Sequence, residues 1–222
     1  MPINVQVGRP IGAVIAAAGQ SRRMGQPKQL LPWGERTVIE AVVEKLEAAG
    51  VSPIVCVVGR RGAEIEQALA TTSAYVIHNS LYKSTEMLYS FQMGIAYLGE
   101  LIAAPSSPST DSGRIDPELT GTLLSLGDQP HIPLSILRQI CTQIQKVPEK
   151  IVIPSHQMRR GHPFFIPRML WPQVTSLGQE ESLRSLLQTH TELIEYVNLN
   201  SDAILADMDT PEDYAVLLER WL

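Results

Sequence analysis

The chain alternates short runs of apolar residues with longer stretches in which apolar residues recur every three or four positions. Short, continuously apolar runs are typical of strands buried on both faces, and the longer periodic stretches are typical of helices packed along one side. The expected strands cover 11–17, 53–58, 75–77, 123–126, 151–153, 164–166 and 193–197. The expected helices cover 37–50, 63–70, 85–98, 133–146, 182–189 and a last stretch from 211. This alternation predicts an α/β fold with a mainly parallel sheet covered by helices on both faces.

Capping residues mark the ends of two of these helices. Thr37 precedes the first helical stretch and Gly50 follows it, as an N-cap and a C-terminal stop do. Near the C-terminus, Thr210 is followed by Pro211, and Asp213 stands three residues after Thr210. Since this is the pattern of an N-cap, a first helical position and a capping partner, we interpret 210–213 as structural.

The length of the chain is consistent with one large domain. It has 222 residues, against roughly 150 for a common domain. Without an internal repeat or a long linker, we predict a single domain over 8–222, with 1–7 as an N-terminal extension. The segment 103–118 is rich in Ser, Pro and Asp and is expected to be a surface loop.

Composition and charge exclude several classes of protein. Hydrophobic residues make up 44% and charged residues 18%, which excludes a disordered chain. The balance of 18 Lys+Arg against 23 Asp+Glu gives a net charge of −5. Because nucleic-acid and anionic membrane surfaces require clustered cations, we expect neither partner.

The N-terminal sequence and the two cysteines indicate the cellular compartment. The N-terminal residues lack the pattern of a signal peptide, and the apolar run 11–18 is shorter than the roughly 20 residues that span a bilayer. Cys56 and Cys141 both have apolar neighbours and form no disulfide or zinc motif. We therefore expect a cytoplasmic protein whose two thiols are reduced and packed in the core.

The loop after the first strand is the strongest candidate for a ligand site. In parallel α/β sheets, ligands bind beyond the carboxyl ends of the strands. Small residues from Ala17 to Gly19 allow the backbone to approach phosphate oxygens, and Arg22, Arg23 and Lys28 supply three cations. The loop is neither a Walker A motif nor Gly-x-Gly-x-x-Gly, which weakens a dinucleotide-dependent oxidoreductase hypothesis.

Carboxylates in two other places are candidate metal ligands. Asp128 follows Gly127 at the end of a buried strand, where a Mg²⁺ ion could bridge it to substrate phosphates. Asp207 and Asp209 precede the last helix, and in an extended segment their side chains share one face. Either could be the second ligand of the same metal, and both remain open at this point.

A further candidate segment is Gly161-His162-Pro163. Gly161 allows close backbone approach, and the His162 imidazole could donate a hydrogen bond or contact a phosphate. A lone histidine is more often a packed or capping residue, so both interpretations are kept.

Four motifs occur together in one order along the chain. They are Ala-Ala-Gly-x-Ser-x-Arg-Met-Gly-x-x-Lys at 17–28, Leu-Leu-Pro-Trp at 30–33, Gly-Asp-x-Pro at 127–130, and Asp-x-Asp-Thr-Pro-Glu-Asp at 207–213. In this combination the chain resembles the MobA-like NTP transferase family, and most closely its molybdenum cofactor cytidylyltransferase branch. The resemblance extends over roughly 11–222.

The resemblance implies a Rossmann-like three-layer α/β/α nucleotidyltransferase fold and a reaction. CMP would pass from CTP to molybdopterin or Mo-molybdopterin with release of pyrophosphate, using Mg²⁺, or Mn²⁺ in its place. GTP is the alternative donor, and a molybdoenzyme is implied as a transient partner. The acceptor phosphate would attack the α-phosphorus directly, so neither a protein nucleophile nor a general base is required.

The resemblance also implies roles for individual residues. The catalytic residues would be Arg23, Lys28 and Asp128, and the metal would bind Asp128 together with Asp209 or Asp207. The acceptor would contact Gly161, His162 and Pro163. The nucleotide would contact Ala17, Ala18, Gly19, Ser21, Arg22, Arg23, Met24, Gly25, Lys28, Ser90 and Gly127.

Two positions depart from the pattern of the family. Glu86 stands where a glycine is usual ahead of Ser90, and Ser182 replaces a glycine ahead of Arg184. Ala18-Gly19 favours the cytidylyl over the guanylyl branch. The alternatives are a guanylyltransferase, a sugar- or polyol-phosphate nucleotidyltransferase, and a non-catalytic carrier of molybdenum cofactor; a redox enzyme on this fold is the weakest.

Overall fold

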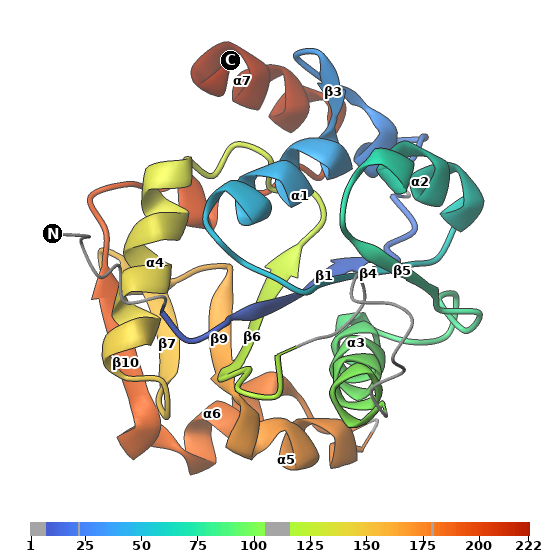
Figure 1. Ribbon diagram of the computed structural model, residues 1–222. Helices are drawn as coiled ribbons and strands as arrows, with labels where there is room; N and C mark the ends of the chain where they lie inside the picture. The colour runs from blue at the N-terminus through green and yellow to red at the C-terminus, as the bar shows by residue number, and fades with distance from the viewer. Residues whose placement is uncertain (1–7, 22, 105–115, 179) are drawn as a thin grey trace, which may run out of the picture.

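The computed structural model describes residues 8–21, 23–104, 116–178 and 180–222 (Figure 1). Its centre is an eight-stranded sheet in the order β10-β7-β9-β6-β1-β4-β5, with β8 paired to β7. The strands are β1 (Gly12–Ala17), β4 (Ile54–Val58), β5 (Tyr75–His78), β6 (Gly121–Leu126), β7 (Ile151–His156), β8 (Arg159–Arg160), β9 (Phe164–Pro167) and β10 (Ile194–Asn198). A separate hairpin joins β2 (Pro32–Trp33) to β3 (Arg36–Thr37).

The sheet is mainly parallel, as predicted. β1 lies between β4 and β6 and is parallel to both, with Ala13 opposite Ile54 on one side and Leu123 on the other. β9 is the main exception, because it runs antiparallel between β6 and β7. The chain continues from β1 to β4 and β5 in one direction, while β6 lies on the other side of β1. This reversal of strand order creates the crevice at which α/β sheets bind ligands.

Helices cover both faces of the sheet (Figure 1). These helices form two groups, one on each face of the sheet, and the side chains of each group pack into a separate buried cluster. The first group is α1 (Val38–Ala48), α2 (Gly62–Ala68) and α4 (Leu134–Lys146). The second group is α3 (Met87–Ala103), α5 (Trp171–Ser176) and α6 (Leu183–Thr189). The three-layer α/β/α fold class is therefore confirmed.

A third, smaller cluster holds the C-terminal helix α7 (Pro211–Trp221) beside α1 and the β2–β3 hairpin. Leu217 of α7 packs there with Leu31, Trp33 and Val38. Short 3₁₀ turns connect the remaining elements: η1 (Lys28–Leu30), η2 (Leu69–Thr71), η3 (Arg168–Leu170), η4 (Thr191–Leu193) and η5 (Ala203–Leu205).

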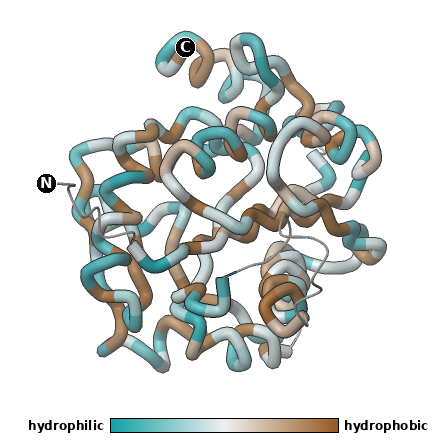
Figure 2. Tube along the Cα trace, viewed as in Figure 1, coloured by the Kyte–Doolittle hydropathy of each residue, from teal (hydrophilic) through white to brown (hydrophobic). Residues whose placement is uncertain are grey.

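The apolar strands behave as their sequence predicts. Along β1, Ala13 and Ile15 face the first cluster while Val14 faces the second, because successive side chains of a strand point to opposite faces. Figure 2 shows hydrophobic residues following one another along these central strands. Cys56 and Cys141 are free, buried thiols, as expected, and burial raises the pKa of Cys56 to about 12 and that of Cys141 to about 11.

Both predicted N-caps are confirmed, and α3 departs furthest from its predicted bounds. Thr37 and Thr210 each form a complete capping box, with Glu40 and Asp213 as partners. α3 starts two residues later than predicted, after its N-cap Glu86, and continues past Leu98. It continues because the following turn adds apolar side chains that pack against the second cluster. Pattern analysis did not predict α5, β8 or the β2–β3 hairpin.

Two predicted segments lie largely outside the described residues. These are the N-terminal extension 1–7 and the surface loop 103–118, of which 105–115 is not described. Within the described ranges, none of the helices combines the length and apolar character needed to cross a membrane.

Close packing of α3 against β1 predicts opposite effects for two glycines of the same helix. A Cβ at Gly94 would lie 2.2 Å from Cγ1 of Val14, whereas a Cβ at Gly99 meets nothing within 4 Å. We expect Gly94→Ala to lower the free energy of unfolding by about 1–3 kcal/mol through overpacking. Gly99→Ala should raise it by about 0.5–1 kcal/mol, since alanine favours the helix. Urea denaturation of both variants measures this, and a Gly94→Ala chain as stable as the original would contradict the packing.

Candidate functional site

A cavity of about 430 Å³ opens at the carboxyl edge of the sheet. Because β1, β4, β5 and β6 are parallel, the segments that follow them meet at this edge. The lining comes from the loop after β1, the β5–α3 connection, the end of β6 and the segment before α7. The lining residues are Ala16, Ala18, Gly19, Gln20, Ser21, Arg23, Lys28, Gln29, Asn79, Tyr82, Thr85, Glu86, Met87, Ser90, Leu126, Asp128 and Asp209.

The loop after β1 is shaped by its backbone and anchored by one buried side chain. Ser21 and Gly25 both have positive φ angles, 47° and 68°. The Ser21 hydroxyl accepts a hydrogen bond from the backbone N–H of Lys28 at 3.3 Å, which closes the loop on itself. Met24 is buried in the cluster of α1 and α7. Met24 therefore packs inward, while its neighbour Arg23 lines the cavity.

Asp128 is positioned by the end of β6. The backbone N–H of Gly127 donates to the carbonyl of Ala16 at 3.0 Å, so this turn is bonded to the end of β1. A Cβ at Gly127 would lie 3.0 Å from the Cβ of Ala17. A glycine here lets the two strand ends approach closely, and Asp128 follows at the mouth of the crevice.

The acidic segment before α7 is held by Met208. Met208 is fully buried, with Asp207 and Asp209 on either side of it. The carboxylate of Asp213 accepts hydrogen bonds from the backbone N–H groups of Asp209 and Thr210, at 3.1 and 2.8 Å. The capping box thus fixes the residue that enters the cavity.

These segments meet at the ammonium group of Lys28. It forms ion pairs with the carboxylate of Asp128 and, at 3.1 Å, with that of Asp209. The Lys28 side chain is only 13% exposed. Burial alone would lower the pKa of Lys28, but the contacts with Asp128 and Asp209 outweigh it, and its pKa is raised. Lys28 is therefore a positively charged group at neutral pH.

Arg23 extends the cluster toward solvent. Its guanidinium donates to the second oxygen of Asp209 at 2.5 Å, while the Arg23 side chain is 69% exposed. The Asp209 carboxylate thus pairs with both Arg23 and Lys28. An exposed guanidinium of this kind is free to exchange a carboxylate for a phosphate.

The structure distinguishes the two carboxylates that the sequence left open. Asp209 is ion-paired and lines the cavity, whereas Asp207 has no ion pair within the described ranges. Partial burial, followed by the nearby charges of Asp209 and Asp128, raises the pKa of Asp207. Asp207 therefore lies near the cluster without belonging to its ion pairs.

The carboxylates suit a metal ion that also binds substrate. No group of three or more His, Cys, Asp or Glu side chains in the described ranges could hold a metal ion by itself. Mg²⁺ usually binds one or two carboxylates together with phosphates and water. Asp128 and Asp209, gathered at one ammonium, are a donor set of that kind.

The segment 161–163 lies beside this cluster but does not line the cavity. A Cβ at Gly161 would lie 2.3 Å from the carbonyl oxygen of Ile204, so this position requires glycine. Burial lowers the pKa of His162 to about 4, with a smaller opposing effect from Asp128. His162 is therefore a neutral, half-buried ring packed against Phe164 at a centroid distance of 5.3 Å.

Of the residues singled out from the sequence, the structure brings one group together around the cavity. That group is Ala18, Gly19, Ser21, Arg23, Lys28, Ser90, Asp128 and Asp209. A second group lies behind or beside the lining: Ala17, Met24, Gly25, Gly127, Gly161, His162, Pro163 and Asp207. Arg22 lies outside the described residues.

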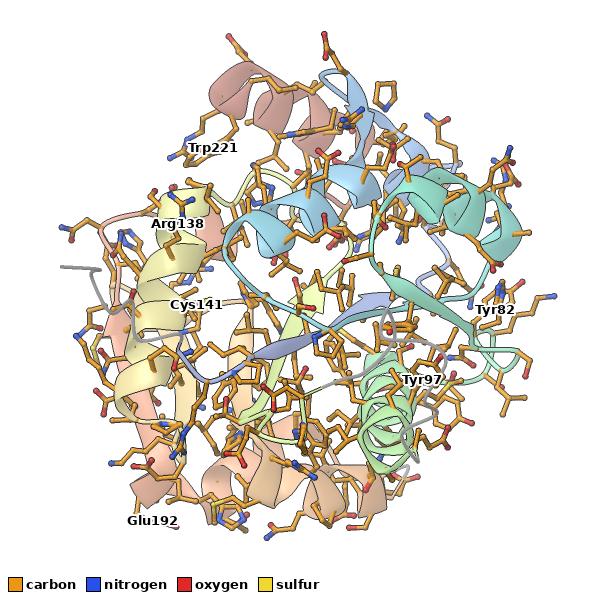
Figure 3. All side chains as sticks on the ribbon, viewed as in Figure 1. Tyr82, Tyr97, Arg138, Cys141, Glu192 and Trp221 are labelled. Atoms are coloured by element: carbon orange, nitrogen blue, oxygen red, sulfur yellow. The ribbon has the colours of Figure 1, made fainter. Side chains whose placement is uncertain are left out.

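Sequence reasoning assigned no role to most of the β5–α3 wall. Asn79, Tyr82 and Glu86 all line the cavity from this connection. In Figure 3, Tyr82 is labelled at the right of the view and Trp221, on α7, at the upper left. Their position in the sequence could have indicated this role. They follow the strand expected at 75–77, and a strand parallel to the first one ends at the same edge of the sheet.

The chain is similar in sequence to proteins of known function. The chain is 27% identical over 212 residues to the molybdenum cofactor cytidylyltransferase of Escherichia coli (strain K12), covering 95% of this chain and 97% of that protein. It is 26% identical over 216 residues to the nicotine blue oxidoreductase of Paenarthrobacter nicotinovorans, covering 94% and 96%.

Solved structures share the fold. The crystal structure of Rv0371c from Mycobacterium tuberculosis H37Rv superposes with a TM-score of 0.72 at 26% identity, covering 95% of this chain and 98% of that one. The same protein in complex with manganese gives 0.70 at 24% identity, with the same coverage. The model of the MobA-like NTP transferase domain matches residues 13–194. Since that match covers well over half of the chain, the protein belongs to the MobA-like NTP transferase family of nucleotidyltransferases.

Proposed function

We propose that this protein transfers CMP from CTP to a molybdopterin-type phosphorylated acceptor and releases pyrophosphate. The observation that carries the proposal is a charged cluster in the cavity, at the point where the strand order of the sheet reverses. We call it the Lys28 cluster; it consists of Arg23, Lys28, Asp128 and Asp209. The choice of CTP and of a pterin acceptor rests on the similarity to the E. coli cytidylyltransferase and on the Ala18-Gly19 pair.

The cations have a direct use in this chemistry. Nucleotidyl transfer requires mainly positioning and neutralisation of charge on the phosphates. In our proposal Arg23 and Lys28 exchange their carboxylate contacts for oxygens of the triphosphate. Backbone groups of the loop from Ala18 to Gly19 approach the nucleotide, and Ser21 holds that loop in shape.

We propose Asp128 and Asp209 as the metal-binding pair, with Asp207 as a nearby third carboxylate. A bound Mg²⁺ or Mn²⁺ ion would neutralise phosphate charge next to these side chains. The manganese complex of Rv0371c supports a divalent metal in this fold. Freed from both carboxylates by such an ion, the Lys28 ammonium would be available to the phosphates.

The acceptor phosphate attacks the α-phosphorus, one P–O bond forms, and the bond to pyrophosphate breaks. A phosphate monoester is already ionised near neutral pH, so no side chain has to remove a proton. We propose Gly161, His162 and Pro163 on the acceptor side, where His162 is neutral because burial lowers its pKa to about 4. A neutral imidazole there would act as a hydrogen-bonding group rather than as a cation.

The similarity to nicotine blue oxidoreductase supports a second candidate, a redox reaction on the same fold. The loop after β1 contains no Gly-x-Gly-x-x-Gly fingerprint, and its cations suit a triphosphate better. We therefore prefer the transferase, and an activity assay distinguishes it from the redox reaction.

Incubation with each NTP, Mg²⁺ and molybdopterin or Mo-molybdopterin tests the function. We expect pyrophosphate release with CTP, loss of turnover in EDTA, and recovery when Mg²⁺ or Mn²⁺ is restored. Turnover with GTP, or with a sugar or polyol phosphate as acceptor, would replace the substrates proposed here. Tight acceptor binding with no turnover would indicate a carrier, and oxidation of a nicotinamide cofactor would indicate the redox reaction.

Asp128→Asn should lower kcat by about 100-fold or more, because a charge next to the reacting phosphates is lost. The amide is isosteric but no longer pairs with the buried Lys28 ammonium, so the melting temperature should also fall, and turnover is compared at a temperature at which both proteins remain folded. Asp116→Asn is a matched control, since Asp116 lies outside the cavity and its carboxylate accepts a hydrogen bond from the backbone N–H of Glu118. Near-normal turnover of Asp128→Asn under the same Mg²⁺ concentration would refute the metal assignment.

Arg23→Ala should raise the KM for the NTP about tenfold, the effect of losing one charge-assisted hydrogen bond. Stability should be nearly unchanged, because an exposed ion pair contributes little. Arg36→Ala serves as the control, as Arg36 pairs with Glu44 at 2.7 Å outside the cavity. Steady-state kinetics with a varied NTP concentration decides, and an unchanged KM and kcat would exclude Arg23 from triphosphate binding.

A further inference from the structure

Glu86 differs from the other carboxylates that line the cavity. Asp128 and Asp209 are each ion-paired with Lys28. Glu86 is exposed and lines the same cavity, yet within the described chain its carboxylate has neither an ion pair nor a hydrogen bond. It is the N-cap residue of α3, but its side chain does not cap the helix. The carboxylate is therefore available to a ligand.

The position of Glu86 is fixed by the turn that precedes it. The side-chain oxygen of Asn79 accepts from the backbone N–H of Leu81 at 2.9 Å, and its amide donates to the Thr85 hydroxyl at 3.1 Å. Thr85 in turn donates to the carbonyl of Leu81 at 2.9 Å. Asn79 is buried. These bonds join both ends of the turn, so the chain enters α3 in one defined direction.

Ser90 lies in the first turn of α3, four residues after the N-cap Glu86. It is 2% exposed and lines the cavity, and its hydroxyl has no hydrogen-bond partner in the described ranges. A carboxylate that only accepts hydrogen bonds and a hydroxyl that also donates them thus line the same cavity.

The cavity is electrostatically polarised. α3 covers the sheet face opposite to α1, whereas Asp209 comes from the segment before α7, which packs beside α1 (Figure 1). The cations Arg23 and Lys28 belong to that second side. A triphosphate is attracted to the cations and repelled by Glu86, so an uncharged part of the nucleotide is the group that Glu86 can accept.

We infer that Glu86 accepts a hydrogen bond from the exocyclic amino group of the nucleobase and thereby selects cytosine over uracil. This inference rests on the proposed function. The N4 amino group of cytosine is a donor, whereas the O4 atom of uracil at the same position is an acceptor. A carboxylate accepts a hydrogen bond from the N4 amino group of cytosine. It is repelled by the O4 atom of uracil, because an ionised carboxylate has no hydrogen to donate.

Binding of CTP and UTP in the presence of Mg²⁺, measured by calorimetry, tests this without an acceptor. We expect the original chain to prefer CTP by about 10- to 100-fold, the range for one well-made base contact. Glu86→Gln should bring the ratio of the two dissociation constants close to one, because an amide both donates and accepts. Glu86→Ala should weaken CTP binding while leaving UTP binding unchanged or stronger.

Glu100→Gln is the matched control, since Glu100 is exposed near the other end of the same helix. It should keep the original ratio, and all variants should keep the original melting temperature. An unchanged CTP to UTP ratio in Glu86→Gln would overturn the inference while leaving the transferase intact. Failure of the original chain to bind any NTP would instead overturn the proposed function, and this inference with it.

Discussion

The ammonium of Lys28 binds two carboxylates that belong to distant parts of the chain. Asp128 comes from the end of β6 and Asp209 from the segment before α7, so one cation joins three segments at the mouth of the crevice. Burying that cation is unfavourable, and the two carboxylates more than offset the cost, which keeps it charged. The charges gathered in the cavity are thus those that a triphosphate and its metal would require, and in our proposal binding exchanges one set of charged partners for another.

This arrangement reconciles the acidic composition with an anionic substrate. A net charge of −5 disfavours a long polyanion, because an extended duplex needs an extended basic surface. A single nucleotide requires only a local site. In our proposal Arg23 and Lys28 provide it, and the carboxylates around them are suited to a divalent cation that would add further positive charge.

Much of the framework of this site follows from local signals in the sequence. Apolar runs, capping residues and the Gly127-Asp128 turn depend on neighbours along the chain, and they occur as predicted. The choice between Asp207 and Asp209 could not be predicted, because it depends on the burial of Met208 and on a lysine 181 residues away. The antiparallel insertion of β9 escaped for the same reason, because its hydrogen-bond partners on β6 and β7 are set by tertiary packing rather than by local pattern. The Asn79 turn escaped although its partners are local, because its side-chain hydrogen bonds follow neither the helix nor the strand period.

The two sides of the cavity have different physical tasks. The Lys28 cluster on one side is suited to the charge of the phosphates, which is common to every nucleoside triphosphate. The β5–α3 wall on the other side presents the Glu86 carboxylate and the Ser90 hydroxyl, groups that could distinguish one base from another. A division of this kind lets substitutions in one wall change the substrate while the charged cluster is retained.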